Sequence, residues 1–433
     1  MPPPDPTDPY ATPEQRGGWR YSPWFLLAVL TAVNTVNWAD RQVVPILVPA
    51  IGEELMLTDA QLGVMGSLAF AAIYAISAFP FGYGADRWIR RNLIAFGLVV
   101  WSIATAASGM ATGFGSLIAA RFFTGIGEAS LYPCAMSLIA QRFPALSRGR
   151  AMGIFGAAAA VGGGLGIAAG GALSTALGWR SVFTIYGIGG LFLLPLLLSV
   201  PEERRPAPKG EDADTLGAMG RLISDPRLLL TWTSGALMIA SGIGYAFWMP
   251  TYLVRYRGFD VSTAALLMGA AQLVGGLGGA LLGGVLADRR RRKRGVGGEL
   301  DVPIVAGIVA APLAAITLVT TWEPLLWATT ILAPMAILAY FPAIQTVIVG
   351  VAPPRQHGIA YAINILFLAG LGQGLGPTLL GVASDLLGEL RPAMVFPLGG
   401  MLTAALVMWL AQRRIMRGVA EADVEPASEP VQG

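Results

Sequence analysis

Four charged residues lie inside long apolar stretches of this 433-residue chain: Asp40, Arg41, Arg121 and Glu128. A charge at the centre of a bilayer costs at least about 2.5–3.5 kcal/mol, so it needs a partner or a water-filled cavity. Arg121 and Glu128 are seven residues apart, so they share one face of a helix about two turns apart, with Gly125 between them. Asp40 and Arg41 are adjacent and point roughly 100° apart on a helix, so they cannot both face the same partner.

These residue types predict two kinds of chemistry. A guanidinium binds phosphate or carboxylate in bidentate fashion, so Arg41 and Arg121 are candidate ligands of an anionic substrate. Proton coupling needs a carboxylate that gains and loses a proton near neutral pH, and Asp40 and Glu128 are the only carboxylates within the apolar stretches. We expect both to carry protons, with Asp40 against Arg121, and with Arg41 turned toward the substrate. The alternative is a structural group of ion pairs that locks two helices together.

Aromatic and amide side chains in the second half of the chain are further candidates for substrate binding. Aromatic rings suit the wall of an apolar pocket, and amides within a membrane need partners or line a cavity. Helix packing and interface anchoring are the alternatives for each of them. The candidates are Tyr245, Trp248, Gln272, Gln345 and Asn364.

Composition defines the elements that must position these residues. The chain is 55% hydrophobic and only 13% charged, whereas an average soluble domain carries about 25% charged residues. Stretches of roughly 18 to 25 residues without a charge have the length of a helix that crosses a bilayer. This excludes a soluble enzyme and a nucleic-acid binder. The chain has one cysteine, Cys134, and no nucleophile–base or metal-ligand pattern, so we expect no enzyme activity, cofactor or metal.

Twelve apolar runs predict an all-α membrane protein in which twelve transmembrane helices form two six-helix bundles. The runs are 24–48, 61–82, 93–111, 116–139, 151–174, 181–199, 229–252, 262–286, 302–320, 325–349, 358–384 and 393–412. The predicted parts are a disordered tail at 1–22, bundles at 23–200 and 228–412, a polar linker at 201–227 and a second tail at 413–433. Within the linker, 215–224 is expected to form a short amphipathic helix on the inner surface.

The distribution of basic residues predicts the orientation. With the N-terminus inside, 23 of the 29 Lys and Arg residues fall in inner segments and 4 in outer loops. Such an excess marks the cytoplasmic side, so both termini are expected to be cytoplasmic. The preference for Arg over Lys, with abundant Ala and Gly, suggests a GC-rich bacterial genome and hence the inner membrane of a bacterium.

Two polar loops repeat 202 residues apart, after the second and the eighth apolar runs. Segments 82–91 and 284–293 both contain Gly-x-x-Ala-Asp-Arg followed by further basic residues. They resemble the signature loop of the major facilitator superfamily, G-x-L-a-D-R-x-G-R-R, from which they depart at Gly84, Ile89 and Arg291. The resemblance implies two related halves working by alternating access. We expect the loop residues to act as gates: Asp86, Arg87, Arg91, Asp288 and Arg289.

A narrower resemblance rests on two short segments. Asn37-Trp-Ala-Asp-Arg41 and Gly125-Ile-Gly-Glu-Ala-Ser130 look like the Spinster branch, whose members export sphingosine-1-phosphate or lysophospholipids. The resemblance implies a lipid substrate and adds Asn37 to the candidate ligands. Within the fifth run, residues 166–171 lack the proline of the drug-antiporter motif G-P-x-x-G-G, which counts against a multidrug exporter.

Together these features predict a monomeric secondary transporter in the lipid bilayer. It would move an amphipathic anionic lipid, such as sphingosine-1-phosphate or a lysophospholipid, with coupling to protons. The first alternative is a proton-coupled carrier of a small organic anion such as a sugar acid, which the two arginines serve equally well. A receptor without transport activity and a lipid scramblase are further alternatives.

Overall fold

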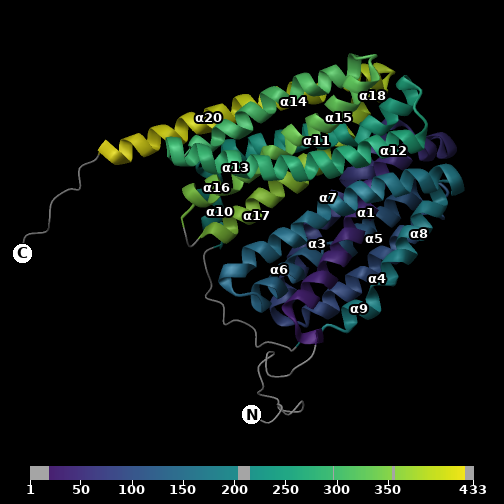
Figure 1. Ribbon diagram of the computed structural model, residues 1–433, viewed down its shortest axis with the longest axis horizontal. Coiled ribbons are helices and arrows are strands. Elements are labelled where there is room, and N and C mark those ends of the chain that lie inside the picture. Colours follow the sequence, from purple (N-terminus) through teal and green to yellow (C-terminus); the bar gives the residue numbers. More distant parts are fainter. Residues whose placement is uncertain (1–18, 203–214, 296, 354–355, 425–433) are drawn as a thin grey trace, which may run out of the picture. The chain divides into compact units, whose positions relative to one another are not determined.

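The computed structural model describes residues 19–202, 215–295, 297–353 and 356–424, and every regular element in those ranges is a helix (Figure 1). The chain forms two compact units. One comprises the described residues of Met1–Glu211 with Met249–Leu273, and the other those of Asp212–Trp248 with Val274–Gly433. The predicted bundle boundaries differ from this partition, because the segment after Trp248 packs with the first unit.

The first unit contains the helices of the first six apolar runs and the start of the eighth. Its elements are η1 (Trp19–Tyr21), α1 (Pro23–Leu55), α2 (Asp59–Gly63), η2 (Val64–Leu68), α3 (Ala69–Arg87), α4 (Arg90–Ser108), α5 (Phe114–Glu128), α6 (Leu131–Arg142), α7 (Ala145–Leu177), α8 (Trp179–Leu191), α9 (Leu194–Leu198) and α12 (Val261–Ala270). The second half of the chain adds α10 (Thr215–Ser224), α11 (Pro226–Arg257), η3 (Ala271–Gly275), α13 (Gly276–Arg294), η4 (Gly298–Leu300), α14 (Asp301–Val319), α15 (Glu323–Ala339), α16 (Phe341–Val351), α17 (His357–Ile365), η6 (Leu366–Gln373), α18 (Gly374–Leu387), α19 (Leu390–Ala393) and α20 (Phe396–Val424). The elements η2, η3 and η6 are π-helical turns that continue the helices on either side.

Every predicted apolar run falls on one helix or on consecutive helices, and prolines account for several of the breaks. A proline ring clashes with the carbonyl four residues earlier. In four runs the first helix ends within one residue of that position, and the prolines concerned are Pro133, Pro195, Pro342 and Pro397. Other prolines, such as Pro80 and Pro312, lie within continuous helices.

Ten helical segments of the described chain are long and apolar enough to cross a membrane. The two remaining predicted runs, 24–48 and 116–139, correspond to α1 and to α5 with α6. Helix α1 carries Asn37, Asp40 and Arg41 at its centre, which lowers its hydropathy, and the second run is divided at residues 129–130. Both exceptions therefore occur where the candidate charged residues lie.

Parts of the predicted tails and linker are ordered. Trp19–Tyr21 forms a turn whose Tyr21 carbonyl accepts a hydrogen bond from Arg142 (3.3 Å), and α20 continues through Val424. The amphipathic helix expected at 215–224 is present as α10. The remainder of these predictions, at 1–18, 203–214 and 425–433, lies outside the described residues.

Helix α7 packs against α1 through a line of glycines. A Cβ added to Gly162 would lie 2.1 Å from the carbonyl oxygen of Thr35, and one added to Gly166 would lie 2.6 Å from Cα of Ala39. Gly170 continues this line one turn later. Small residues at four-residue spacing allow two helix backbones to approach closely within a membrane. The close approach fixes α1, and with it the charged residues at the centre of α1.

A second face of α7 packs in the same way against α12. A Cβ on Gly164 would lie 2.8 Å from the carbonyl oxygen of Gly269, and one on Gly171 would lie 2.1 Å from Cβ of Ala265. The segment that carries α12 is also held by Arg255, whose Nη1 donates to both carboxylate oxygens of Asp59 at 2.9 and 3.0 Å. These contacts account for the grouping of Met249–Leu273 with the first unit.

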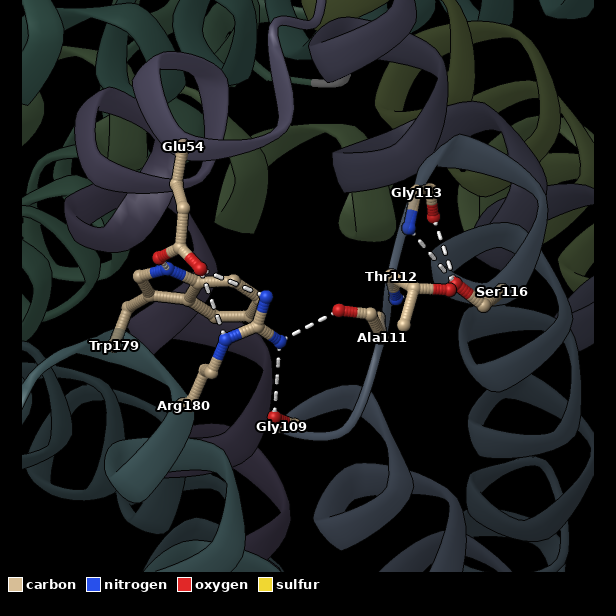
Figure 2. A network of polar contacts seen from close by, with 8 residues as sticks. All are labelled: Glu54, Gly109, Ala111, Thr112, Gly113, Ser116, Trp179 and Arg180. Atoms are coloured by element: carbon tan, nitrogen blue, oxygen red, sulfur yellow. Dashed lines mark hydrogen bonds and ion pairs between the residues drawn. The ribbon is translucent and has the colours of Figure 1, made fainter.

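A polar network joins the C-terminal end of α1 to the start of α8 and to the loop between α4 and α5 (Figure 2). Arg180 donates to Glu54 Oε1 through Nε and Nη2 at 3.1 and 2.8 Å, and Trp179 Nε1 donates to Glu54 Oε2 at 2.6 Å. Arg180 Nη1 also donates to the carbonyls of Gly109 and Ala111 at 3.2 and 2.5 Å. One side chain therefore connects α1, the start of α8 and the loop between α4 and α5.

The same loop is stabilised at the start of α5. The backbone N–H groups of Thr112 and Gly113 both donate to Ser116 Oγ, at 3.1 and 3.2 Å. These bonds satisfy donors that a helix start would otherwise leave free. The network thereby fixes the N-terminal end of the helix that carries Arg121 and Glu128.

We predict that Gly162→Ala lowers the unfolding temperature, because the added methyl group would be forced against the Thr35 backbone. Overpacking of this kind costs about 1–3 kcal/mol. The matched control is Gly156→Ala on the same helix, where a Cβ meets no atom within 4 Å. Thermal unfolding in detergent measures both. Equal unfolding temperatures for the two variants would contradict the close approach of α1 and α7.

We also predict an acid-sensitive contribution from Glu54. Hydrogen bonds from Trp179 and Arg180 hold the pKa of Glu54 below its ordinary value. The stabilisation is therefore complete above the ordinary pKa of Glu and is lost as the pH falls through the lowered value. Glu54→Gln should lower the unfolding temperature at pH 7 and have less effect near pH 4. The control is Glu53→Gln at the neighbouring exposed residue, which should leave the unfolding temperature unchanged at both pH values. If Glu54→Gln lowered the unfolding temperature equally at pH 7 and near pH 4, the linkage would be refuted.

Candidate functional site

Two helices of the first unit bring the candidate charged residues together. Helix α1 supplies Asn37, Asp40 and Arg41, and α5 supplies Arg121 and Glu128. Asp40, Arg121 and Glu128 are 0%, 3% and 1% exposed, respectively. We call these five residues the charged cluster. The seven-residue spacing on α5 and the adjacency on α1 therefore lead to one buried site.

The shortest contact in the charged cluster joins Arg41 to Glu128. Arg41 Nε donates to Glu128 Oε2 at 2.5 Å. The guanidinium also lies over aromatic rings, at 4.6 Å from the centroid of Phe70, 4.5 Å from that of Tyr74 and 5.3 Å from that of Trp38. Cation–π contacts of this kind stabilise a cation more strongly when water is excluded. The predicted arrangement, with Arg41 turned toward a substrate, is not the one observed, because Glu128 and the rings occupy its guanidinium.

Asp40 has no such partner. Both of its carboxylate oxygens are buried and make no hydrogen bond in the described part of the chain. It interacts electrostatically with Arg121 and with Glu128, and also with Tyr186, whose hydroxyl donates to the carbonyl of Gly166 at 2.6 Å. A buried carboxylate without a hydrogen bond is costly as an anion. Asp40 is therefore the residue of the cluster best suited to hold a proton.

Arg121 is only loosely held. Its Nη2 donates to Ser108 Oγ at 3.5 Å, its Nε has no partner among the described residues, and its guanidinium lies 5.4 Å from the ring centroid of Phe183. Buried Arg side chains are usually saturated with hydrogen bonds, and an unsatisfied one marks a functional candidate. Arg121 thus has a donor available for an anion, and its predicted role as a substrate ligand stays a prediction.

Sequence reasoning missed the aromatic side chains around Arg41. Phe70 and Tyr74 are four residues apart, so they project from one face of α3. The rings of Phe70 and Tyr74 stack with their centroids 5.6 Å apart. Trp38 precedes Arg41 by three residues on α1. The spacing was a usable signal, but only the fold brings α3 next to Arg41.

The aromatic candidates of the second half are buried packing residues in the structure. Trp248 is fully buried and its Nε1 donates to the carbonyl of Pro377 at 2.9 Å. Tyr245 is also buried, and its hydroxyl donates to the carbonyl of Ala314 at 3.5 Å. Both satisfy their polar atoms on neighbouring helices, as the packing alternative expects, and their role in binding stays a prediction.

The three amide candidates have different surroundings. Gln272 lies against Gly163 together with Gln42 of α1. Asn364 is 1% exposed and Gln345 is partly buried; the side-chain oxygen of each has no hydrogen-bond partner in the described residues. Unsatisfied amides in an apolar interior are available to a ligand or to water. Asn37 likewise has an Nδ2 without a partner, although its side chain interacts with Glu128.

The predicted gate residues of the first loop are partly engaged in local contacts. Arg91 donates through Nη1 to the carbonyls of Leu198 and Val200 at 3.2 and 2.9 Å. The backbone N–H of Arg91 donates to Glu202 at 2.6 Å, so Glu202 caps the start of α4. Arg87 lies 3.6 Å from the ring centroid of Tyr83. The side chain of Asp86 lies outside the described residues.

In the second loop the ion pairs are made by arginines that follow the predicted gate residues Asp288 and Arg289. Asp288 and Arg289 are exposed and make no hydrogen bond or ion pair within the described ranges. Instead Arg291 pairs with the buried Glu299 at 3.2 Å, and Arg294 pairs with Asp301 at 3.1 Å. The gating roles of both loops stay predictions.

No group of three or more potential metal ligands occurs among the described His, Cys, Asp and Glu residues.

Comparison with known proteins identifies the family. The model of the Major Facilitator Superfamily matches residues 18–300, well over half of the chain.

The chain belongs to the Major Facilitator Superfamily. It is therefore a multi-pass membrane transporter with the twelve-helix fold of that superfamily, and it is not an enzyme. This confirms the superfamily resemblance that the two repeated loops carried.

Individual relatives differ in their substrates. The chain is 28% identical to an MFS-type efflux pump of Mycolicibacterium smegmatis, over 92% of this chain and 94% of that one. It is 27% identical to a probable galactarate/D-glucarate transporter of Bacillus subtilis, over 89% and 91%. A solved bacterial homolog of the human lysosomal transporter Spinster, in an inward-facing and unoccupied conformation, matches with a TM-score of 0.79 at 25% identity, over 93% and 99%.

We predict that Glu128→Ala destabilises the protein by about 3–5 kcal/mol, because it leaves Arg41 buried without its counter-charge. The double variant Arg41→Met with Glu128→Met should recover most of that loss, since it removes both charges and keeps the volume. Thermal unfolding of the single and double variants in detergent measures the coupling. Additive losses from the two sites would contradict a direct Arg41–Glu128 pair.

Proposed function

We propose that this protein is a proton-coupled transporter of an amphipathic anionic lipid of the sphingosine-1-phosphate or lysophospholipid type. The proposal rests on one observation: the charged cluster contains a fully buried carboxylate, Asp40, next to two arginines, and its oxygens have no hydrogen-bond partner among the described residues. In an apolar interior such a carboxylate and an anion compete for the same positive charge.

Charge balance supplies the coupling. When all four groups are ionised, Asp40 and Glu128 balance Arg41 and Arg121. A proton on Asp40 leaves one positive charge without a counter-ion, and a substrate anion restores neutrality. Proton and anion therefore favour each other's binding, and linkage makes the two effects equal in size. This linkage moves the proton and the anion in the same direction.

The second carboxylate extends the mechanism. Glu128 holds Arg41 at 2.5 Å. A phosphate that replaces Glu128 on Arg41 leaves that carboxylate in apolar surroundings, where it takes up a proton. Arg41 then alternates between Glu128 and the substrate. Arg121, whose Nε has no partner in the described part of the chain, supplies a second guanidinium for the same anion.

Two observations support a lipid among possible anions. The rings of Phe70, Tyr74 and Trp38 surround the Arg41 guanidinium, so apolar surface adjoins the basic group, as an amphipathic substrate requires. The likeness to the bacterial Spinster homolog extends over nearly the whole chain. We further infer, from the basic residues and the bacterial relatives, that the protein works in the cytoplasmic membrane of a bacterium with both termini inside.

A second candidate is a proton-coupled carrier of a sugar acid. The relative from Bacillus subtilis, a probable galactarate/D-glucarate transporter, favours it. The guanidinium groups of Arg41 and Arg121 bind carboxylate as well as phosphate. The charge balance and the direction of coupling are the same for both candidates, so only the substrate distinguishes them.

We predict that proteoliposomes of the wild-type protein transport fluorescent sphingosine-1-phosphate faster when a pH gradient is imposed. Asp40→Asn should abolish the response to the gradient, because the residue no longer exchanges a proton. Arg121→Ala should reduce flux at least about tenfold, the effect of losing roughly 1.4 kcal/mol or more of anion binding.

The control for charge is the exposed Glu53→Gln, which should transport as the wild type does. Gradient-driven flux of radiolabelled glucarate without lipid flux would replace the lipid proposal with the sugar-acid candidate. Lipid flux that ignores the gradient and survives Asp40→Asn would instead indicate a scramblase, and full gradient response in Asp40→Asn would refute the role of Asp40.

A further inference from the structure

A basic groove lies within the second unit, where α10 and the start of α11 meet the C-terminal part of α20. It is open to solvent and encloses about 840 Å³. Four arginines and one aspartate are its charged lining residues: Arg221, Arg227, Arg414, Arg417 and Asp225. We call this feature the basic groove. It is built from residues other than those of the charged cluster.

The groove retains uncompensated positive charge. Arg227 Nη2 pairs with Asp225 Oδ2 at 2.8 Å, so these two charges neutralise each other. Burial alone would raise the pKa of Asp225, but hydrogen bonds from Arg227 hold this pKa below its ordinary value. The pair therefore stays ionised at neutral pH. Arg414 and Arg417 are exposed and have no hydrogen bond or ion pair among the described residues. They are three residues apart on α20 and thus share a face.

The position of the groove along the helices corresponds to the edge of the apolar stretch. The last predicted transmembrane run ends at 412, and directly after it Arg413 lies 3.6 Å from the ring centroid of Trp409. Tryptophan is enriched at the level of lipid headgroups. Helix α11 starts at Pro226, three residues before its own predicted run. Both helices therefore present their arginines at headgroup depth.

The groove lies where α10 packs on the rest of the unit, and its neighbours Ala218 and Leu222 on α10 are buried. A phosphate that is joined to acyl chains reaches a groove at headgroup depth from the bilayer. The depth of the groove therefore favours a phospholipid over a free inorganic anion.

We propose that the basic groove binds the headgroup phosphate of an anionic membrane phospholipid. Arg414 and Arg417, which line the groove, provide the guanidinium donors for this phosphate. Basic pockets between helices on the cytoplasmic side are suited to such headgroups. The site is independent of the proposed transport function and of its substrate, because no residue of the charged cluster takes part in it.

The test uses the full-length protein and equal amounts of phosphatidylglycerol and phosphatidylcholine in detergent, with the lipids retained counted by native mass spectrometry. The wild type should retain phosphatidylglycerol in preference. The double variant Arg414→Gln with Arg417→Gln should bind it roughly 10- to 30-fold more weakly, as expected for two surface arginines. Unfolding temperatures in phosphatidylcholine alone verify that the variants fold.

The matched control is Arg289→Gln with Arg413→Gln, which removes two exposed arginines predicted to lie on the same side of the membrane but outside the groove. It should retain phosphatidylglycerol as the wild type does. Equal loss in both double variants, or no loss in either, would overturn the proposal. An excess of inorganic phosphate forms the last arm: displacement of phosphatidylglycerol by phosphate alone would identify a free-anion site and overturn the lipid assignment.

Discussion

The apolar interior of a membrane protein tolerates charge only when the charges balance, and the first unit is organised around that constraint. Arg41 is neutralised by Glu128 at 2.5 Å and surrounded by three aromatic rings. These contacts require α1, α3 and α5 to meet at one depth. The glycine line of α7 brings α1 into place, and Ser116 together with the Arg180 network fixes the beginning of α5. The helix packing described above therefore serves the positions of four charged side chains.

The two halves of the chain solve the problem of buried polarity differently. The first half buries charges within its helices. The described part of the second half relies on neutral hydrogen bonds, such as that between Thr317 and Thr329 (2.9 Å) and that of the Ser234 hydroxyl with Tyr340. A buried carboxylate of this half, Glu299, lies in the short turn η4 before α14 and is neutralised by Arg291. Among the described residues, charges at the centre of the membrane-spanning helices therefore occur only in the first half.

The sequence was sufficient for some features and not for others, for identifiable physical reasons. Helix periodicity predicted that Arg121 and Glu128 share a face, and the positions of Pro133, Pro195, Pro342 and Pro397 account for helix breaks. Periodicity did not decide which arginine pairs with which carboxylate, because both pairings satisfy the same spacing. The aromatic surroundings of Arg41 and the ion pairs of Arg291 and Arg294 depend on contacts between distant segments, which no local pattern encodes.

Helix α7 has a property that its hydrogen bonds and charges do not reveal. Its closest approaches to α1 and to α12 are made by glycine backbone, at Gly162 and Gly166 on one side and at Gly164 on the other. Burying a glycine costs no side-chain conformational entropy, whereas burying a long side chain costs up to about 2 kcal/mol. At these positions α7 therefore holds α1 and α12 without immobilising any rotamer of its own.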